Sequence, residues 1–480
     1  MRASVAVRYI GLILLLIGIS ILLSAGVGLC YHDSSVPGLV VSGLLVSGFG
    51  IFPMVFVPRP KGLTASESIL VVSGAWVATS VAGAIPFFLW GNPFTPVNSL
   101  FESISGFTTT GASILADVES LPKGILFWRA LTHWIGGTGI ILFALAVLPA
   151  LGPVSQTLLR QEYTSLTHPS PFPRARILAR VIILVYVGLT VLQVLMLVIA
   201  KVGLFDATTT AFASISTGGF SVRNASIAAY NSFAVELIVI LFMVLGASNF
   251  AFLYGLMIQR HTKVPGWEVF RTFIALLVIG WVITAIFIHG TVYQDWGNAF
   301  RYAAFQVATI ATTTGFATAD SAVWTPPAHM VLILVALIGA CAGSTGGGVK
   351  IDRFILFNKL AIQRFKTFIH PQRVISLSIE GRPIKQELAE SAALFIVLYL
   401  AVTALSTILL TFTGAGLIES FSGTVACIGN CGPGLGQVGS MGNYGGLTDV
   451  AKLILCVVML IGRLEIFAMI LPFTVGFWRR

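Results

Sequence analysis

Four short segments rich in threonine and glycine recur along the chain, and each precedes a long apolar stretch. Their last glycines are separated by 108, 96 and 117 residues. The segments are Thr108-Thr109-Thr110-Gly111, Ser216-Thr217-Gly218-Gly219, Thr312-Thr313-Thr314-Gly315 and Gly429-Asn430-Cys431-Gly432. One such segment alone is usually a turn, whereas four copies at similar spacing predict four similar units around one axis.

The composition decides the environment of these units. Charged residues make up only 10% of the 480 residues, and hydrophobic residues make up 56%. Soluble domains average about 25% charged residues, so we expect an integral membrane protein. Apolar runs of about 20 residues, enough to span a bilayer as a helix, occur at 7–29, 177–200, 233–257, 270–288 and 450–473. They lack alternation of apolar and polar residues, which predicts an all-α fold.

Each unit is predicted to contain an outer helix, a short pore helix, the threonine–glycine segment and a second helix. We place the units at 63–160, 161–262, 263–380 and 381–480, after an N-terminal two-helix hairpin at 1–62. The pore helices, at 97–107, 206–215, 296–311 and 417–428, enter the membrane without crossing it. Single second helices are expected at 123–151, 231–259 and 448–477. The repeats are therefore parallel, unlike the inverted repeats of many secondary transporters.

Basic residues predict the orientation in the membrane. Of the 28 lysines and arginines, we place 20 on one side. They lie near both termini and in the segments 59–61, 160–180, 260–263 and 350–385. Basic loops stay cytoplasmic, so both termini are expected inside the cell. The charge sits at helix ends and not on one soluble face, which argues against nucleic-acid binding.

The repeated segments have the chemistry of a cation filter. Backbone carbonyls from four chains can replace the water around a dehydrated cation, and glycine leaves room at the axis. The candidate ligands are Thr109, Thr110, Gly111, Thr217, Gly218, Gly219, Thr313, Thr314, Gly315, Asn430, Cys431 and Gly432. The carboxyl ends of the pore helices would add partial negative charge. Cys427 and Cys431 are interpreted as small packing residues and not a metal pair, because no further ligand completes a site.

A glycine-rich run interrupts the second helix of the third unit. It contains Gly343, Ser344, Thr345, Gly346, Gly347 and Gly348. Each glycine costs about 1 kcal/mol relative to alanine in a helix interior, so a break is expected. A loop here could obstruct the pore below the filter and move when a partner pulls on it. The alternatives are a cytoplasmic turn or a phosphate cradle, although the Gly-Lys-Ser/Thr ending of a phosphate-binding loop is missing.

Two charges, Arg463 and Glu465, lie in the last apolar run. Charges at mid-span are costly and usually face protein or water. Arg463 near the pore would limit how long a cation stays there. The alternative is an ion pair between helices that fixes their packing. Residues two apart do not share a helix face, so a direct Arg463–Glu465 pair is not assured.

At this point the chain resembles the Trk/Ktr/HKT superfamily of potassium transporters, and within it the bacterial TrkH type. The resemblance covers nearly the whole sequence. Its most specific motifs are the third-unit loop at 339–350 and the run Gly432-Pro433-Gly434-Leu435-Gly436, and the run Gly462-Arg463-Leu464-Glu465 also matches. Cys431 departs from the pattern, because bacterial relatives often carry an aliphatic residue there.

The resemblance implies four helix–pore-helix–helix units with one pore per subunit, in a homodimer of the bacterial inner membrane. It also implies a cytosolic nucleotide-binding regulator of the TrkA type. Glycine at all four filter positions implies a preference for K⁺, bound in the filter as the transported ion. The third-unit loop then corresponds to the family's gate, with Arg463 near the pore.

We therefore expect regulated potassium uptake. The main alternative is an ion-coupled symporter, driven by H⁺ or Na⁺, and sequence does not decide between coupled transport and channel-like flow. An enzyme is not expected, because the spans hold no His-rich helix, nucleophile elbow or paired catalytic carboxylates. Glu102, Glu236 and Glu419 are isolated in sequence and are predicted to bond to nearby backbone or polar groups.

Overall fold

The computed structural model describes residues 3–58, 64–147, 175–257, 266–372, 376–380 and 382–473. Within these ranges, six helices are long and apolar enough to cross a membrane, or seven if one bent pair counts as a single span. Large apolar side chains such as Phe49, Phe52 and Phe56 are exposed on the outer helices, as expected for a lipid-facing surface. The prediction of an all-α integral membrane protein is confirmed.

The element order repeats four times after the hairpin of α1 (Ala3–Cys30) and α2 (Val36–Phe56). The first repeat has α3 (Ala65–Trp90), α4 (Pro96–Phe107) and α5 (Lys123–Val147); the second has α7 (Ala175–Ile199), α8 (Leu204–Ile215), α9 (Phe233–Gly246) and α10 (Phe250–Met257). The third has α11 (Trp267–Ile288), α12 (Trp296–Ala311) and α13 (Pro326–Ile338); the fourth has α15 (Gln386–Thr411), α16 (Leu417–Ile428), α17 (Asp449–Arg463) and α18 (Phe467–Ile470). Single 3₁₀ turns lie at η2 (Ser226–Tyr230), η3 (Ser321–Val323), η4 (Gly436–Val438) and η5 (Leu471–Phe473).

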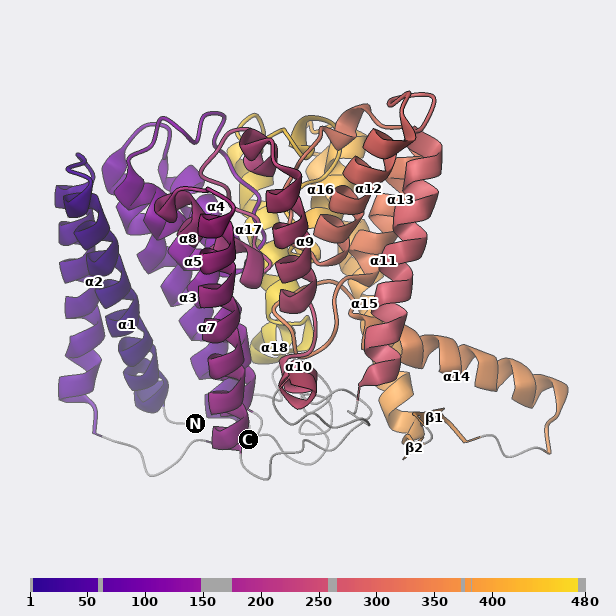
Figure 1. Ribbon diagram of the computed structural model, residues 1–480. Coiled ribbons are helices and arrows are strands. Elements are labelled where there is room, and N and C mark those ends of the chain that lie inside the picture. The colour runs from indigo at the N-terminus through magenta and orange to yellow at the C-terminus, as the bar shows by residue number, and fades with distance from the viewer. Residues whose placement is uncertain are drawn as a thin grey trace.

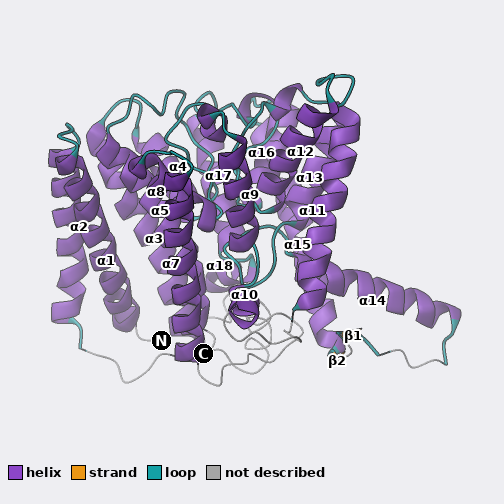
Figure 2. Ribbon diagram, viewed as in Figure 1, coloured by secondary structure: helices purple, strands orange, loops and turns teal. Residues whose placement is uncertain are grey.

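The short helices α4, α8, α12 and α16 lie in the upper half of the bundle and do not cross it (Figure 1). Loops gather above them at the same end (Figure 2). Local caps explain where two of these helices begin. The Thr95 hydroxyl accepts from Asn98 N–H before Pro96, and the Asp295 carboxylate accepts from Asn298 N–H. Such caps satisfy amide groups that a helix leaves unpaired at its start.

Two second helices that were expected to be continuous are broken, so those predictions were wrong. In the second repeat, α9 and α10 meet at 107° across a short break. In the fourth repeat, α17 ends at Arg463 and Glu465 adopts a positive φ of 51°. The α9–α10 break exchanges backbone hydrogen bonds with a buried loop, whereas at the end of α17 the side chains of Arg463 and Glu465 contact that loop and the residues after it.

The third and fourth repeats are connected by α14 (Ile351–Ile369) and a small hairpin of β1 (Ser378–Ile379) and β2 (Arg382–Pro383). The helix α14 extends sideways from the lower end of the bundle (Figure 1). The start of α1 and the short α18 lie toward that same end.

Several basic residues used to predict orientation lie outside the described residues: Arg2, Arg59, Lys61, Arg160, Arg174, Arg260, Lys263, Arg373, Arg479 and Arg480. The proposed unit boundaries between 62 and 63, 160 and 161, and 262 and 263 also fall there. The cytoplasmic placement of both termini and the unit boundaries remain predictions.

Candidate cation filter

All four short helices end in the same hydrogen-bonded turn. The residue before each filter glycine donates its amide N–H to a carbonyl of the pore helix five residues earlier. These bonds join Thr110 to Ser105 (2.9 Å), Gly218 to Ala213 (2.8 Å), Thr314 to Thr309 (2.8 Å) and Cys431 to Ala426 (2.8 Å). The amide groups are therefore satisfied by the helix, and this pairing uses carbonyls that a helix end leaves free.

The backbone alternates its handedness through each segment. Thr109, Thr217, Thr313 and Asn430 have φ between 50° and 54°. The glycines two residues later, Gly111, Gly219, Gly315 and Gly432, have φ between 80° and 91°. Such alternation gathers successive amide groups on one side of the chain, so the carbonyls face the other side. A side chain at the glycine positions would be strained by the backbone alone.

The four segments form a closed ring. A Cβ atom built on Gly111 would lie no more than 2.5 Å from the carbonyl oxygen of Gly218, in the next repeat. The same limit holds for Gly219 against Thr314, Gly315 against Cys431, and Gly432 against Thr110. The relation runs from repeat one to two, three, four and back to one, so the twelve predicted ligand residues come together around one axis.

Four carbonyl oxygens point to a candidate site in this ring. Within the described ranges, the carbonyls of Thr110, Gly218, Thr314 and Cys431 accept no hydrogen bond, although these residues are buried. A buried carbonyl normally has a partner. An alkali cation held by oxygens would supply one.

Side-chain ligands offer no competing metal site. Across the described part of the chain, no group of three or more His, Cys, Asp or Glu side chains gathers. The five cysteines are all unpaired. Cys427 and Cys431 are both buried, in keeping with their interpretation as packing residues.

The third-unit loop lies directly below this ring. Gly347 N–H donates to the Thr313 hydroxyl at 2.9 Å, and the Thr345 hydroxyl lies 3.2 Å from that of Thr217. Gly339, with φ of 71°, ends α13, and Gly348 has φ of 81°. Within the loop, Ser344 donates to Cys341 O at 2.6 Å and accepts from Gly346 N–H at 3.2 Å. The loop is thus folded and buried, not a solvent-exposed turn.

The break between α9 and α10 provides acceptors for this loop. Cys341 N–H donates to Ala247 O at 3.1 Å, and Thr345 N–H donates to Gly246 O at 3.3 Å. On the other side of the break, Phe250 N–H donates to Gly343 O at 3.1 Å. The carbonyls that a continuous helix would have used internally therefore bind the loop, which is the physical reason for the break.

Arg463 contacts the loop directly. It donates to Thr345 O at 2.7 Å and to Gly136 O of α5 at 3.0 Å. Glu465 instead pairs with Lys350 at 2.6 Å and with Arg353. The end of α17 therefore holds the loop at Thr345 through Arg463, and the turn after α17 holds Lys350, at the end of the loop, through Glu465.

Two of the three carboxylates that looked isolated in sequence have ionic partners. Glu102 is fully buried, pairs with Arg129 of α5 at 2.6 Å and accepts from Ser113 and from Ile114 N–H. Glu236 pairs with Arg301 at 2.7 Å. Arg129, a charge within a largely apolar second helix, was the signal for the first pair, but sequence could not identify its partner 27 residues away.

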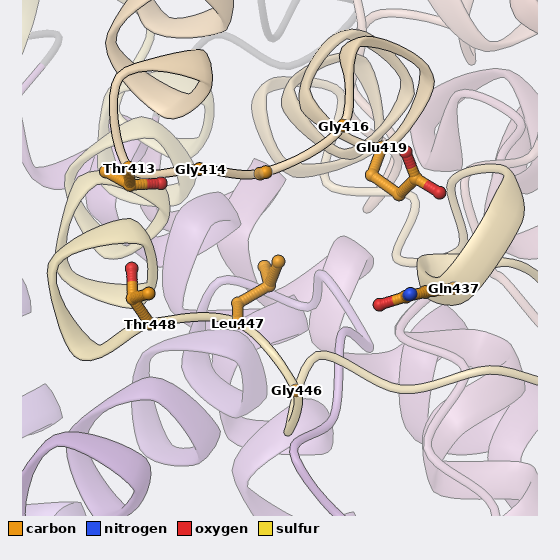
Figure 3. A pocket seen from close by; sticks show the side chains of 9 residues that line it. Thr413, Gly414, Gly416, Glu419, Gln437, Gly446, Leu447 and Thr448 are labelled. Carbon is orange, nitrogen blue, oxygen red and sulfur yellow. The ribbon is translucent and has the colours of Figure 1, made fainter.

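The third carboxylate, Glu419, lines a cavity of about 230 Å³ between the end of α15 and the starts of α16 and α17. Figure 3 shows Glu419 and Gln437 on one side of this cavity, with Thr413 and Thr448 on the other. None of the twelve predicted filter residues lines it. The cavity is therefore separate from the ring.

Comparisons with known proteins bear on this geometry. Residues 58–477 match the family model described as "TrkH: Cation transport protein". The chain is 35% identical to the Trk system potassium uptake proteins TrkH of Salmonella typhimurium and Escherichia coli, over 98% of each chain. The crystal structure of the potassium transporter TrkH from Vibrio parahaemolyticus matches with a TM-score of 0.90 and 32% identity, covering 100% of both chains.

Proposed function

Because this chain belongs to the TrkH family of cation transport proteins, we propose that it takes up potassium across a membrane through the ring of four threonine–glycine segments. The family is one of transporters and not of enzymes. Relatives that match over 98% of the chain are named for potassium uptake. The transported ion, K⁺, would bind transiently to the ring and is not a resident cofactor.

The closed ring of unpaired carbonyls is the observation that supports this proposal best. Each repeat contributes the same backbone shape, and each glycine lies against the carbonyl that the next repeat contributes. An ion at the centre would replace its water with these oxygens. The carboxyl ends of the four short helices point toward the same place and would favour a positive charge there.

We assign the gating role to residues 343–348 of the third-unit loop. Its hydrogen bonds to Thr313 and to the α9–α10 break support an obstructing position below the ring. Arg463 would hold the loop there and repel a cation that passes the ring. Moving α14, which begins directly after the loop, would pull on it.

The assembly is proposed from the family resemblance. We infer a homodimer in the bacterial inner membrane, with both termini in the cytoplasm and a TrkA-type nucleotide-binding regulator on that side. Basic residues of α14, including Lys359, Arg364 and Lys366, lie at the end of the bundle that this orientation places inside the cell. A regulator docked at this end would be well placed to move α14.

Flux measurements test the proposal. Proteoliposomes containing the purified full chain should take up radioactive rubidium, with K⁺ competing and Na⁺ competing far less. Addition of the regulator with nucleotide should raise the rate. Absence of rubidium flux in both conditions would contradict the proposal. An obligatory requirement for an H⁺ or Na⁺ gradient would instead establish the symporter alternative.

A further inference from the structure

The four filter segments differ at the residue just before the glycine. Three repeats have a side chain there, whereas the second repeat has Gly218. The three side chains are anchored: Thr110 to Thr108 (2.8 Å), Thr314 to Thr312 (2.8 Å), and Cys431 Sγ to Ile310 O (3.7 Å). The backbone does not require glycine at 218, because its φ is not in the left-handed region.

A side chain from another repeat occupies the missing place. A Cβ atom on Gly218 would lie no more than 2.5 Å from Nδ1 and Cγ of His133, in α5 of the first repeat. The imidazole is fully buried. The ring of His133 therefore fills the volume that a filter side chain fills in the other repeats.

Several contacts fix this ring in position. It stacks on Phe220, two residues after Gly218, with centroids 4.0 Å apart and planes at 15°. Phe220 N–H donates a long bond of 3.4 Å to His133 Nδ1. Arg129, one helical turn before His133, lies 3.6 Å from the Phe220 ring centroid and donates to Ser221 O at 2.8 Å. The buried Glu102 holds Arg129 in turn.

We propose that His133 is a positioning residue of the filter, which supports the Gly218 carbonyl from behind as an anchored side chain does in the other three repeats. The inference rests on the proposed filter function. If the support is lost, the Gly218 oxygen is free to adjust to a smaller ion, and discrimination between K⁺ and Na⁺ falls.

The chain itself offers a matched control substitution. Gly136, Gly246 and Gly462 each lie so that a Cβ would come within 2.8 Å of the last carbonyl of their own pore helix. They are therefore equivalent positions. Three residues earlier stand His133, Met243 and Met459, and both methionines are fully buried. Methionine is thus a side chain that this position accepts in two other repeats.

Four variants of the full chain test the inference in proteoliposomes: His133→Ala, His133→Met, Gly218→Thr, and the double variant His133→Ala with Gly218→Thr. The readout is the ratio of rubidium to sodium flux. His133→Ala and Gly218→Thr should each lower the ratio about tenfold, which corresponds to about 1.4 kcal/mol of differential binding. His133→Met should retain most of the wild-type flux ratio. The double variant should recover most of the wild-type flux ratio, because threonine then enters the space that the imidazole leaves.

Three results would overturn the inference: an unchanged ratio in His133→Ala, a ratio in His133→Met as low as in His133→Ala, or a double variant no better than either single one. A wild-type chain without selective rubidium flux would instead contradict the proposed function, so the two failures are distinct. Stabilisation against heat by K⁺ relative to Na⁺ provides a second readout for any variant with little flux.

Discussion

The ring of four carbonyl segments and the layer directly beneath it are built in opposite ways. In the ring, equivalent residues of all four repeats have φ values within 4° of one another at the first position and within 11° at the glycine. Beneath it, the second helices differ in every repeat. The helix α5 continues, α9 bends into α10 by 107°, α13 gives way to a loop, and α17 ends in a turn.

The difference follows from what each layer contacts. A symmetric ion at an axis needs similar oxygens from all sides, so the backbone of each repeat is constrained alike. Under the proposed gating role, the layer beneath obstructs one axis with one loop, and a single loop cannot be four-fold symmetric. The second and fourth repeats adapt to it, as the α9–α10 break and the Arg463 contact show.

The largest effect is expected from a side chain in the ring. Gly315→Ser adds a Cβ at φ of 87° against the Cys431 carbonyl. Backbone strain costs ~1–2 kcal/mol and overpacking ~1–3 kcal/mol, so the ratio of K⁺ to Na⁺ flux should fall about a hundredfold. Serine at Gly111, Gly219 or Gly432 should lower the flux ratio to a similar extent. The control Gly188→Ala, in α7 with open space around it, should leave the flux ratio unchanged. A response confined to one repeat would break the four-fold account of the ring.

The next effect concerns the asymmetric layer. Deletion of 346–348 removes the loop segment that contacts Thr313 and shortens the path from α13 to α14. Loss of several hydrogen bonds of ~1 kcal/mol each should raise flux without the regulator by more than about thirtyfold. The measurement is rubidium uptake by regulator-free proteoliposomes. Unchanged basal uptake would argue that the loop does not obstruct the pathway.

A smaller rise is expected for Arg463→Gln. The variant loses charged hydrogen bonds to Thr345 O and Gly136 O, worth ~1.5–3 kcal/mol, so basal flux should rise about tenfold. Arg463→Lys keeps the charge and should raise basal flux less. If both variants conduct like the wild type, Arg463 does not hold the loop closed.

The smallest effect separates two threonines that are equivalent in the ring. Thr217→Val removes a hydroxyl that contacts Thr345, and a loss of ~1 kcal/mol should raise basal flux about fivefold. Thr109→Val is the matched control, because its buried hydroxyl has no hydrogen-bond partner within the described ranges. Equal basal flux in the two variants would mean that the contact between the loop and Thr217 of the second repeat does not affect the pathway.

Much of the fold could be predicted from the sequence because the relevant signals are local. The side-chain caps of α4 and α12 lie within three residues of each helix start, and the predicted ends of α4, α8, α12 and α16 agree closely with the structure. The interruption after α13 was also predictable, since clustered glycines disfavour a helix wherever they occur.

The breaks after α9 and α17 were not predictable in this way. The sequence around Gly246 is mostly apolar, with only Ser248 and Asn249 polar at the break, and one glycine costs only about 1 kcal/mol in a helix. The break is stabilised by Cys341 and Thr345, which lie almost a hundred residues away along the chain. Hydrogen bonds between such distant segments leave no local pattern.

The sequence by itself therefore determined a helical membrane protein with four repeated segments suited to a ring of carbonyls, because apolar length and glycine placement act locally. Tertiary structure alone decided which carbonyl meets which glycine, which charges pair with Glu102 and Glu465, and that His133 fills the place beside Gly218. These contacts depend on the order of the repeats around the axis, and only packing in three dimensions sets that order.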